Sequence, residues 1–158
     1  MGVAGSGKTT IGSKLADRLG YTFAEGDDFH SDVNRMAMRS GLPLNDDDRA
    51  PWLATIRQWM TDQAAFGLST VVTCSALKRR YRDTLREARG NVIFAHISPP
   101  NDVTTERIEQ RSGHYMPAEL LQSQLMTLEP LMADEDGLTV SMVAAPETIA
   151  ETIATHLG

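Results

Sequence analysis

The sequence predicts an α/β fold with a doubly wound parallel sheet and helices on both faces. Compact runs of β-branched and apolar residues alternate with longer helical stretches along the chain, and this alternation requires parallel crossovers. Charged residues follow directly after several of these runs, where parallel strands carry ligand sites. The 158 residues are enough for one domain, residues 1–158, with a sizeable core.

The first element is a helix that follows a phosphate-binding loop. Residues 2–9, Gly-Val-Ala-Gly-Ser-Gly-Lys-Thr, match the P-loop pattern G-x-x-x-x-G-K-T. The glycines let successive main-chain N–H groups point at phosphate oxygens, Lys8 supplies positive charge, and the Thr9 hydroxyl can ligate Mg²⁺. The helix over 8–19 presents its positive end to the anion and stops at Gly20. The alternative is a glycine-rich turn before an ordinary helix.

A P-loop is expected to follow a strand, but Met1 directly precedes Gly2. In parallel sheets this strand is usually buried on both faces. We therefore expect the natural gene to encode about five to seven apolar, β-forming residues upstream of Met1. Without them the sheet lacks its first strand, and stability should suffer.

The remaining elements follow from the same patterns. The helix over 31–41 has Val33, Met36 and Ala37 near one face, and acidic residues with a proline open the next helix. Strands are expected at 21–25, 69–74, 91–97 and 138–143. Helices are expected at 31–41, from 46 to about 66, at 118–128 and at 147–157. Two more helices are expected to end near residues 88 and 111.

Composition limits the partners. The net charge of −6 argues against bulk nucleic-acid binding, so local basic residues must form any anion site. Cys74 is the single cysteine, which excludes an intrachain disulfide and suits a reducing compartment. No apolar run approaches the ~18 residues of a membrane span. We expect a cytoplasmic protein with neither nucleic-acid nor membrane partners.

Two clusters of charged residues follow expected strands. The first contains Glu25, Asp27, Asp28 and His30, whose carboxylates could accept a proton from an attacking hydroxyl or hold Mg²⁺ through water. Its alternative is a solvated turn. The second contains Lys78, Arg79, Arg80, Arg82 and Arg86. Lys78, Arg82 and Arg86 share one helix face that could clamp a carboxylate or phosphate, unless it is only a solvated basic face.

A third cluster flanks a non-periodic loop at 112–117. Arg107 and Arg111 lie four residues apart, which suits a lid that stabilises charge on a transferring phosphoryl group. The alternative is an ordinary basic helix end. His96 is expected to be a satisfied core residue, because its strand is apolar.

These motifs resemble the small P-loop gluconokinases, which are ATP:D-gluconate 6-phosphotransferases, over nearly the full chain. The stretches Pro-Leu-Asn-Asp-Asp-Asp-Arg at 43–49 and Cys-Ser-Ala-Leu-Lys at 74–78 are the specific ones, and they separate the chain from shikimate-kinase and adenylate-kinase relatives. The resemblance implies a P-loop kinase that uses ATP and Mg²⁺ to phosphorylate the 6-hydroxyl of D-gluconate. It also implies a helical acceptor-binding segment at 30–66 and a lid loop at 112–119, and it suggests a homodimer.

Residue roles carry over from the family motifs. The catalytic residues implied are Lys8, Asp27 and Arg111. The nucleotide site implied contains Gly2, Ala4, Gly5, Ser6, Gly7, Lys8, Thr9, Thr10, Arg107, Arg111 and Pro146. The gluconate pocket implied contains Asp27, His30, Arg49, Lys78, Arg82 and His114, and the magnesium residues are Thr9 and Asp27. Ala37 stands where the family often has lysine. The rival functions are a kinase of another small acid, such as shikimate, and a nucleotide-binding regulatory module with little turnover.

Overall fold

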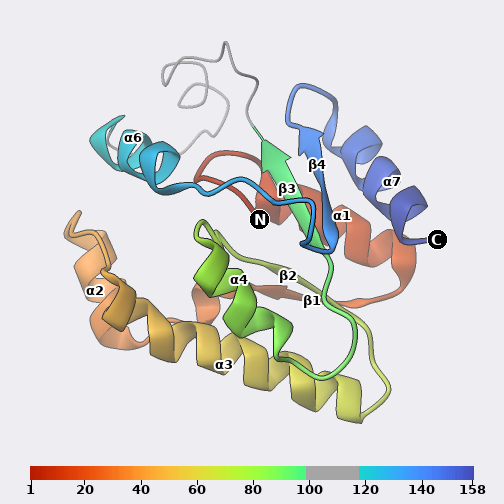
Figure 1. Ribbon diagram of the computed structural model, residues 1–158, viewed down its shortest axis with the longest axis horizontal. Helices are drawn as coiled ribbons and strands as arrows, with labels where there is room; N and C mark the ends of the chain where they lie inside the picture. Colours follow the sequence, from red (N-terminus) through yellow and green to blue (C-terminus); the bar gives the residue numbers. More distant parts are fainter. Residues whose placement is uncertain (99–117) are drawn as a thin grey trace.

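Helices and parallel strands alternate along the chain in a computed structural model that describes residues 1–98 and 118–158 (Figure 1). The helices are α1 (Lys8–Leu19), α2 (Asp32–Arg39), α3 (Asp46–Ala65), α4 (Arg79–Arg86), α6 (Ala118–Thr127) and α7 (Pro146–Leu157), with a 3₁₀ helix η1 (Gly26–Phe29). The strands are β1 (Thr22–Glu25), β2 (Thr70–Thr73), β3 (Phe94–Ser98) and β4 (Gly137–Ser141). These elements confirm the predicted α/β class, although β3 begins at Phe94 rather than at residue 91.

The strands form two parallel pairs. β1 pairs with β2, with Thr22 opposite Thr70, and β3 pairs with β4, with Phe94 opposite Gly137. In the described part of the chain these pairs are two separate two-stranded sheets. The predicted sheet is therefore divided into two halves.

The first two residues of the chain touch both halves. The Met1 amino nitrogen donates to Ala95 O at 2.5 Å, and the Ile97 N–H donates to Met1 O at 2.9 Å. The Gly2 N–H donates to Ser75 O, just beyond β2, at 3.2 Å. Gly2 has a φ of +143°, and a Cβ there would lie 2.6 Å from Ile97 O. Only glycine fits this close approach to β3 without strain.

Helices pack on both faces of the divided sheet. On one face, Trp52 and Ile56 of α3 and Leu85 of α4 form an apolar cluster with Phe94. On the other, α1 and α7 pack side by side, and their buried residues form a second cluster (Figure 1). That cluster contains Ile11, Leu15, Ile97, Met142, Ile149, Ala150 and Ile153. A doubly wound arrangement requires helices on both faces.

Local signals account for the helix starts next to the site. Asn45 and Asp48 form a reciprocal capping box that begins α3, at 2.8 and 2.9 Å. Ser31 caps α2 by accepting from the Asn34 N–H at 3.2 Å. The apolar face expected on α2 does not join the core, because Val33 is 76% exposed. Within residues 1–98 and 118–158, no helix combines the length and apolarity that a bilayer span needs.

Candidate active site

The P-loop folds as an open cradle before α1. Gly5 and Gly7 have φ values of +75° and +86°, the left-handed region that glycine adopts readily. Gly7 is also the N-cap of α1, and it offers no side chain to its first N–H groups. These N–H groups remain available to an anion. The predicted nucleotide residues Gly2, Ala4, Gly5, Ser6, Gly7, Lys8, Thr9 and Thr10 come together in this loop and the first turn of α1.

Three side chains complete the cradle. Lys8 Nζ donates to Val3 O at 2.9 Å, and burial lowers the pKa of Lys8. Gln124 of α6 accepts from the Ala4 N–H at 2.7 Å, which ties α6 to the loop. Ser6 Oγ is buried and has no hydrogen-bond partner among the described residues. A buried hydroxyl without a partner is costly, so this atom fits a site that a ligand completes.

Glu25 links the P-loop to the end of the neighbouring strands. Its Oε2 accepts from Thr9 Oγ1 at 2.6 Å, and its Oε1 accepts from Thr73 Oγ1. Sequence reasoning placed Glu25 in the first charged cluster but assigned the magnesium role to Thr9 and Asp27. The position of Glu25 at the end of β1 was the signal that could have marked it as a further candidate for the magnesium role.

Asp27 and His30 lie on and just after η1. The Asp27 side chain is 75% exposed, and its Oδ1 is 4.0 Å from His30 Nε2. The His30 ring stacks on Trp52 with centroids 4.2 Å apart, and Trp52 Nε1 donates to Gly26 O at 2.7 Å. Burial, followed by the charges of Arg49 and Arg35, lowers the pKa of His30 to about 4. Trp52 therefore fixes the segment that carries Asp27, beside a neutral His30.

Asp46, at the start of α3, gathers polar groups from the beginning of α4. Its carboxylate accepts from Lys78 Nζ at 3.0 and 3.2 Å, and from Arg80 and the Tyr81 hydroxyl. Around the Tyr81 ring lie Arg49 at 5.9 Å, Lys78 at 5.7 Å and Arg80 at 5.6 Å from the centroid. Two predicted substrate residues, Arg49 and Lys78, thus meet at one aromatic ring. The sequence reasoning assigned no site role to Asp46, Arg80 or Tyr81.

Arg82 points away from this cluster into the interior. Its side chain is 0% exposed, and its Nε lies 2.8 and 2.9 Å from the two carboxylate oxygens of Glu135. Its other N–H groups donate to the main-chain carbonyls of Ala76, Leu77, Glu129 and Pro130. Arg86 lies on the same face as Arg82 and also contacts Glu135, at 3.0 Å, whereas Lys78 pairs with Asp46, so the expected common face of all three residues does not form. In this geometry the donors of Arg82, which the family resemblance places in the gluconate pocket, are engaged by protein oxygens.

The remaining predicted site residues divide into two groups. Arg107, Arg111 and His114 lie outside the described residues, as does most of the expected lid loop. Pro146 opens α7, whose first turn is tied to α1 by the ion pair of Lys14 with Glu147 at 2.8 Å.

Comparisons with known proteins bear on this arrangement. A family model described as "AAA domain" matches residues 1–131. The gluconokinase of Gluconobacter oxydans is 46% identical over 156 residues, which cover 99% of this chain and 88% of that protein.

Two solved structures share the fold closely. A sugar kinase from Janibacter sp. HTCC2649 has a TM-score of 0.91 and 51% identity, over 99% of this chain and 91% of that one. A gluconokinase from Sinorhizobium meliloti has a TM-score of 0.87 and 41% identity, over 99% of this chain and 90% of that one. These likenesses confirm the α/β kinase fold that the P-loop and the alternating elements predict.

Proposed function

Because this chain belongs to the gluconokinase family, we propose that it transfers the γ-phosphoryl group of ATP to the 6-hydroxyl of D-gluconate, giving 6-phospho-D-gluconate. The observation that carries the proposal is the 2.6 Å hydrogen bond from Thr9 to Glu25. It joins a phosphate cradle to a strand-end carboxylate, the pairing that phosphoryl transfer from a metal-bound triphosphate requires. We assign the whole chain, 1–158, to one kinase domain, with 30–66 as its acceptor-binding segment.

The triphosphate half of the site is built from the P-loop. Its main-chain N–H groups and the buried Ser6 hydroxyl would bind phosphate oxygens, and Lys8 would exchange the Val3 carbonyl for the β- and γ-phosphates. Mg²⁺, when bound there, would offset the negative charge of these phosphates. Thr9 and Glu25 would hold it, because it prefers hydroxyl and carboxylate oxygens.

Asp27 is our candidate for the general base. Its exposed carboxylate would accept the proton of the 6-hydroxyl as the oxygen attacks the γ-phosphorus in line. The new bond joins that oxygen to phosphorus, and the bond to the bridging oxygen breaks as ADP leaves. Trp52 holds η1 from behind, so Asp27 keeps its position without a reorganisation step.

The acceptor half uses the cations at the start of α3 and α4. We propose that Arg49 and Lys78 bind the gluconate carboxylate and hydroxyls, with His30 as a neutral hydrogen-bonding partner. Asp46 is a positioning residue that fixes Lys78 and Tyr81 before the acceptor arrives. We assign Arg82 a structural role.

Three further assignments rest on the family resemblance. We propose that Arg107 and Arg111 act on the nucleotide, with Arg111 on the transferring group, and that His114 contacts the acceptor. We also propose a homodimer in the cytoplasm, where a reducing environment would keep Cys74 a free thiol. Light scattering of the purified protein measures the oligomer.

The decisive experiment measures ADP release with ATP and Mg²⁺ against a panel of small acids. We expect turnover with D-gluconate and background rates with shikimate and other sugar acids. Activity on shikimate with none on gluconate would overturn the assignment. ATP binding without any acceptor-dependent ADP release would instead indicate a regulatory module.

A further inference from the structure

The start of α4 carries cations where a helix favours anions. In the part of the chain that the structure describes, the N-cap residue Lys78 makes no side-chain cap hydrogen bond, and the first turn of α4 contains no acidic residue. The helix begins instead with Arg79 and Arg80. The first N–H groups of a helix form the positive end of its dipole, so cations there are unfavourable. An anionic acceptor from another segment would satisfy these N–H groups and offset the charge.

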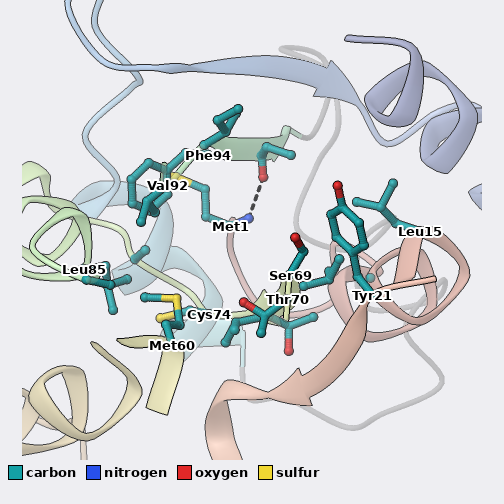
Figure 2. A pocket seen from close by; sticks show the side chains of 18 of the residues that line it. Met1, Leu15, Tyr21, Met60, Ser69, Thr70, Cys74, Leu85, Val92 and Phe94 are labelled. Atoms are coloured by element: carbon teal, nitrogen blue, oxygen red, sulfur yellow. Dashed lines mark hydrogen bonds between the residues drawn. The ribbon is translucent and has the colours of Figure 1, made fainter. Parts of the chain in front are cut away.

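The later part of α4 is held by the apolar core. Figure 2 shows Leu85 of α4 on the same side of an apolar cavity as Met60 of α3. Leu85 and Tyr81 are buried in the cluster that α4 shares with α3. Packing of this kind stabilises the helix along one face, but it leaves the first N–H groups without acceptors. The orientation of Lys78 therefore depends on the groups that bond to the main chain around it.

Glu129 bonds to the main chain on both sides of Lys78. The Glu129 N–H donates to Leu77 O at 2.8 Å, and a Glu129 carboxylate oxygen accepts from the Arg79 N–H at 2.6 Å. The Glu129 carbonyl oxygen accepts from Arg82 instead, at 3.1 Å. The first two bonds fix the peptide planes before and after Lys78. They thereby fix the direction in which its side chain leaves the main chain.

The segment that carries Glu129 is anchored on the P-loop. Glu129 lies two residues after the end of α6, where the chain passes the start of α4 (Figure 1). In α6, Gln124 Oε1 accepts from the Ala4 N–H at 2.7 Å. A third buried apolar cluster joins the P-loop, the residues before α4 and α6, namely Val3, Leu77 and Leu121. One segment therefore contacts both the phosphate cradle and the main chain around Lys78.

We propose that Glu129 is a positioning residue for the acceptor, because it holds the Lys78 side chain in a fixed place relative to the P-loop. The inference rests on the proposed function, in which Lys78 binds gluconate. In-line transfer requires the acceptor hydroxyl to lie close to the γ-phosphorus, so the cation that binds the rest of the acceptor must keep its distance from the phosphate site. Asp46 acts on Lys78 differently, since it accepts from the side-chain nitrogen.

The test measures the KM for gluconate after Glu129→Ala in the full chain. This change leaves the Arg79 N–H without its acceptor, so we expect the KM for gluconate to rise by about 5-fold or more, with the KM for ATP within about 2-fold of the parent value. Glu129→Gln keeps an oxygen acceptor for the same N–H, and we expect it to hold the KM for gluconate within about 2-fold. A general loss of stability would not separate the two KM values.

Asp134→Asn is the matched control. Asp134 pairs with the Arg79 guanidinium at 2.7 Å, so this change alters an ion pair of the same residue and leaves the bond from the Arg79 N–H to Glu129 in place. We expect the KM for gluconate to stay unchanged. Equal KM values in the parent and Glu129→Ala would overturn the proposal, as would an equal rise in Glu129→Gln or in Asp134→Asn.

A second measurement needs no acceptor. The Arg79 amide hydrogen should exchange faster with solvent in Glu129→Ala than in the parent, and an unchanged exchange rate would contradict the proposal. Should Glu129→Ala fail to fold, Glu129→Asp withdraws the carboxylate by one methylene group. Its KM for gluconate and its Arg79 exchange rate should both rise, and parent values of both would overturn the proposal. A parent that phosphorylates a different acid overturns the gluconate assignment alone, and the same comparison then uses the KM for that acid.

Discussion

Replacing Arg82 by methionine separates a structural role from a substrate-binding one. The Arg82 side chain is fully buried against Glu135, whose carboxylate is also buried. Burial opposes ionisation of that carboxylate, but hydrogen bonds from Arg82 and Arg86 lower its pKa overall. Methionine would leave Glu135 with Arg86 alone and would remove the donors to four main-chain carbonyls.

The expected cost follows from these lost contacts. Removing one partner of a buried ion pair typically costs ~3–5 kcal/mol, and that range applies because the arginine also satisfies buried carbonyls. We therefore expect Arg82→Met to lower the free energy of unfolding by ~3–5 kcal/mol. Urea titration followed by circular dichroism measures this change. A second measurement, the KM for gluconate of the folded enzyme, should stay within about 2-fold of the parent value.

Arg79→Met is the matched control. Arg79 also lies on α4, but its ion pair with Asp134 is exposed. Exposed ion pairs contribute little to stability because water and salt screen them, so the free energy of unfolding should change little. The reasoning fails if Arg82→Met keeps its stability within about 1 kcal/mol and raises the KM for gluconate by about 10-fold or more. That result would indicate that Arg82 binds the acceptor.

Four further predictions concern the P-loop, the proposed magnesium site, the core and pH. Lys8→Ala should lower turnover at least ~100-fold in the ADP-release assay, and a near-normal rate would remove Lys8 from the mechanism. Glu25→Gln should raise the Mg²⁺ concentration for half-maximal rate roughly 10-fold, and an unchanged Mg²⁺ titration would argue against Glu25 as a ligand. Gly12→Ala should lower the free energy of unfolding by ~1–3 kcal/mol, because a Cβ there lies 2.7 Å from Thr73 Cγ2; equal urea midpoints would contradict this packing. Folding lowers the pKa of His30 from 6.5 to about 4, so between these pH values the unfolded chain binds more protons and the free energy of unfolding falls as pH drops. His30→Gln should reduce this pH dependence in urea-unfolding experiments, and an identical slope of unfolding free energy against pH in the parent and the variant would refute it.

Sequence patterns predicted the elements whose signals are local. The start of α1 follows from the glycines of the P-loop, and its end follows from Gly20, which has a φ of +69°. The capping box at Asn45 and Asp48 likewise fixes the start of α3 through neighbouring residues. These elements depend on contacts within a few positions, which a linear pattern records.

The side-chain partners could not be predicted because they come from distant segments. Lys78 and Arg82 lie four residues apart, yet they pair with carboxylates from different parts of the chain. Lys78 pairs with Asp46, which precedes it in the sequence, and Arg82 pairs with Glu135, which follows it. Helical periodicity therefore predicted that the two side chains share one face, but in the structure their ion pairs with distant segments direct them apart. His96 shows the same limit: it is buried as expected, but its Nε2 has no hydrogen-bond partner among the described residues.

The stack of His30 on Trp52 gives the enzyme an intrinsic fluorescent probe of its own site. Trp52 is one of two tryptophans, and its buried indole contacts the ring next to Asp27 and the carbonyl of Gly26. The second, Trp59, packs against Phe29 with ring centroids 5.7 Å apart. Phe29 is the last residue of η1, one turn after Gly26. Emission from this pair therefore reports on η1 directly, and a ligand that changes the surroundings of the turn that carries Asp27 can be followed without any attached label.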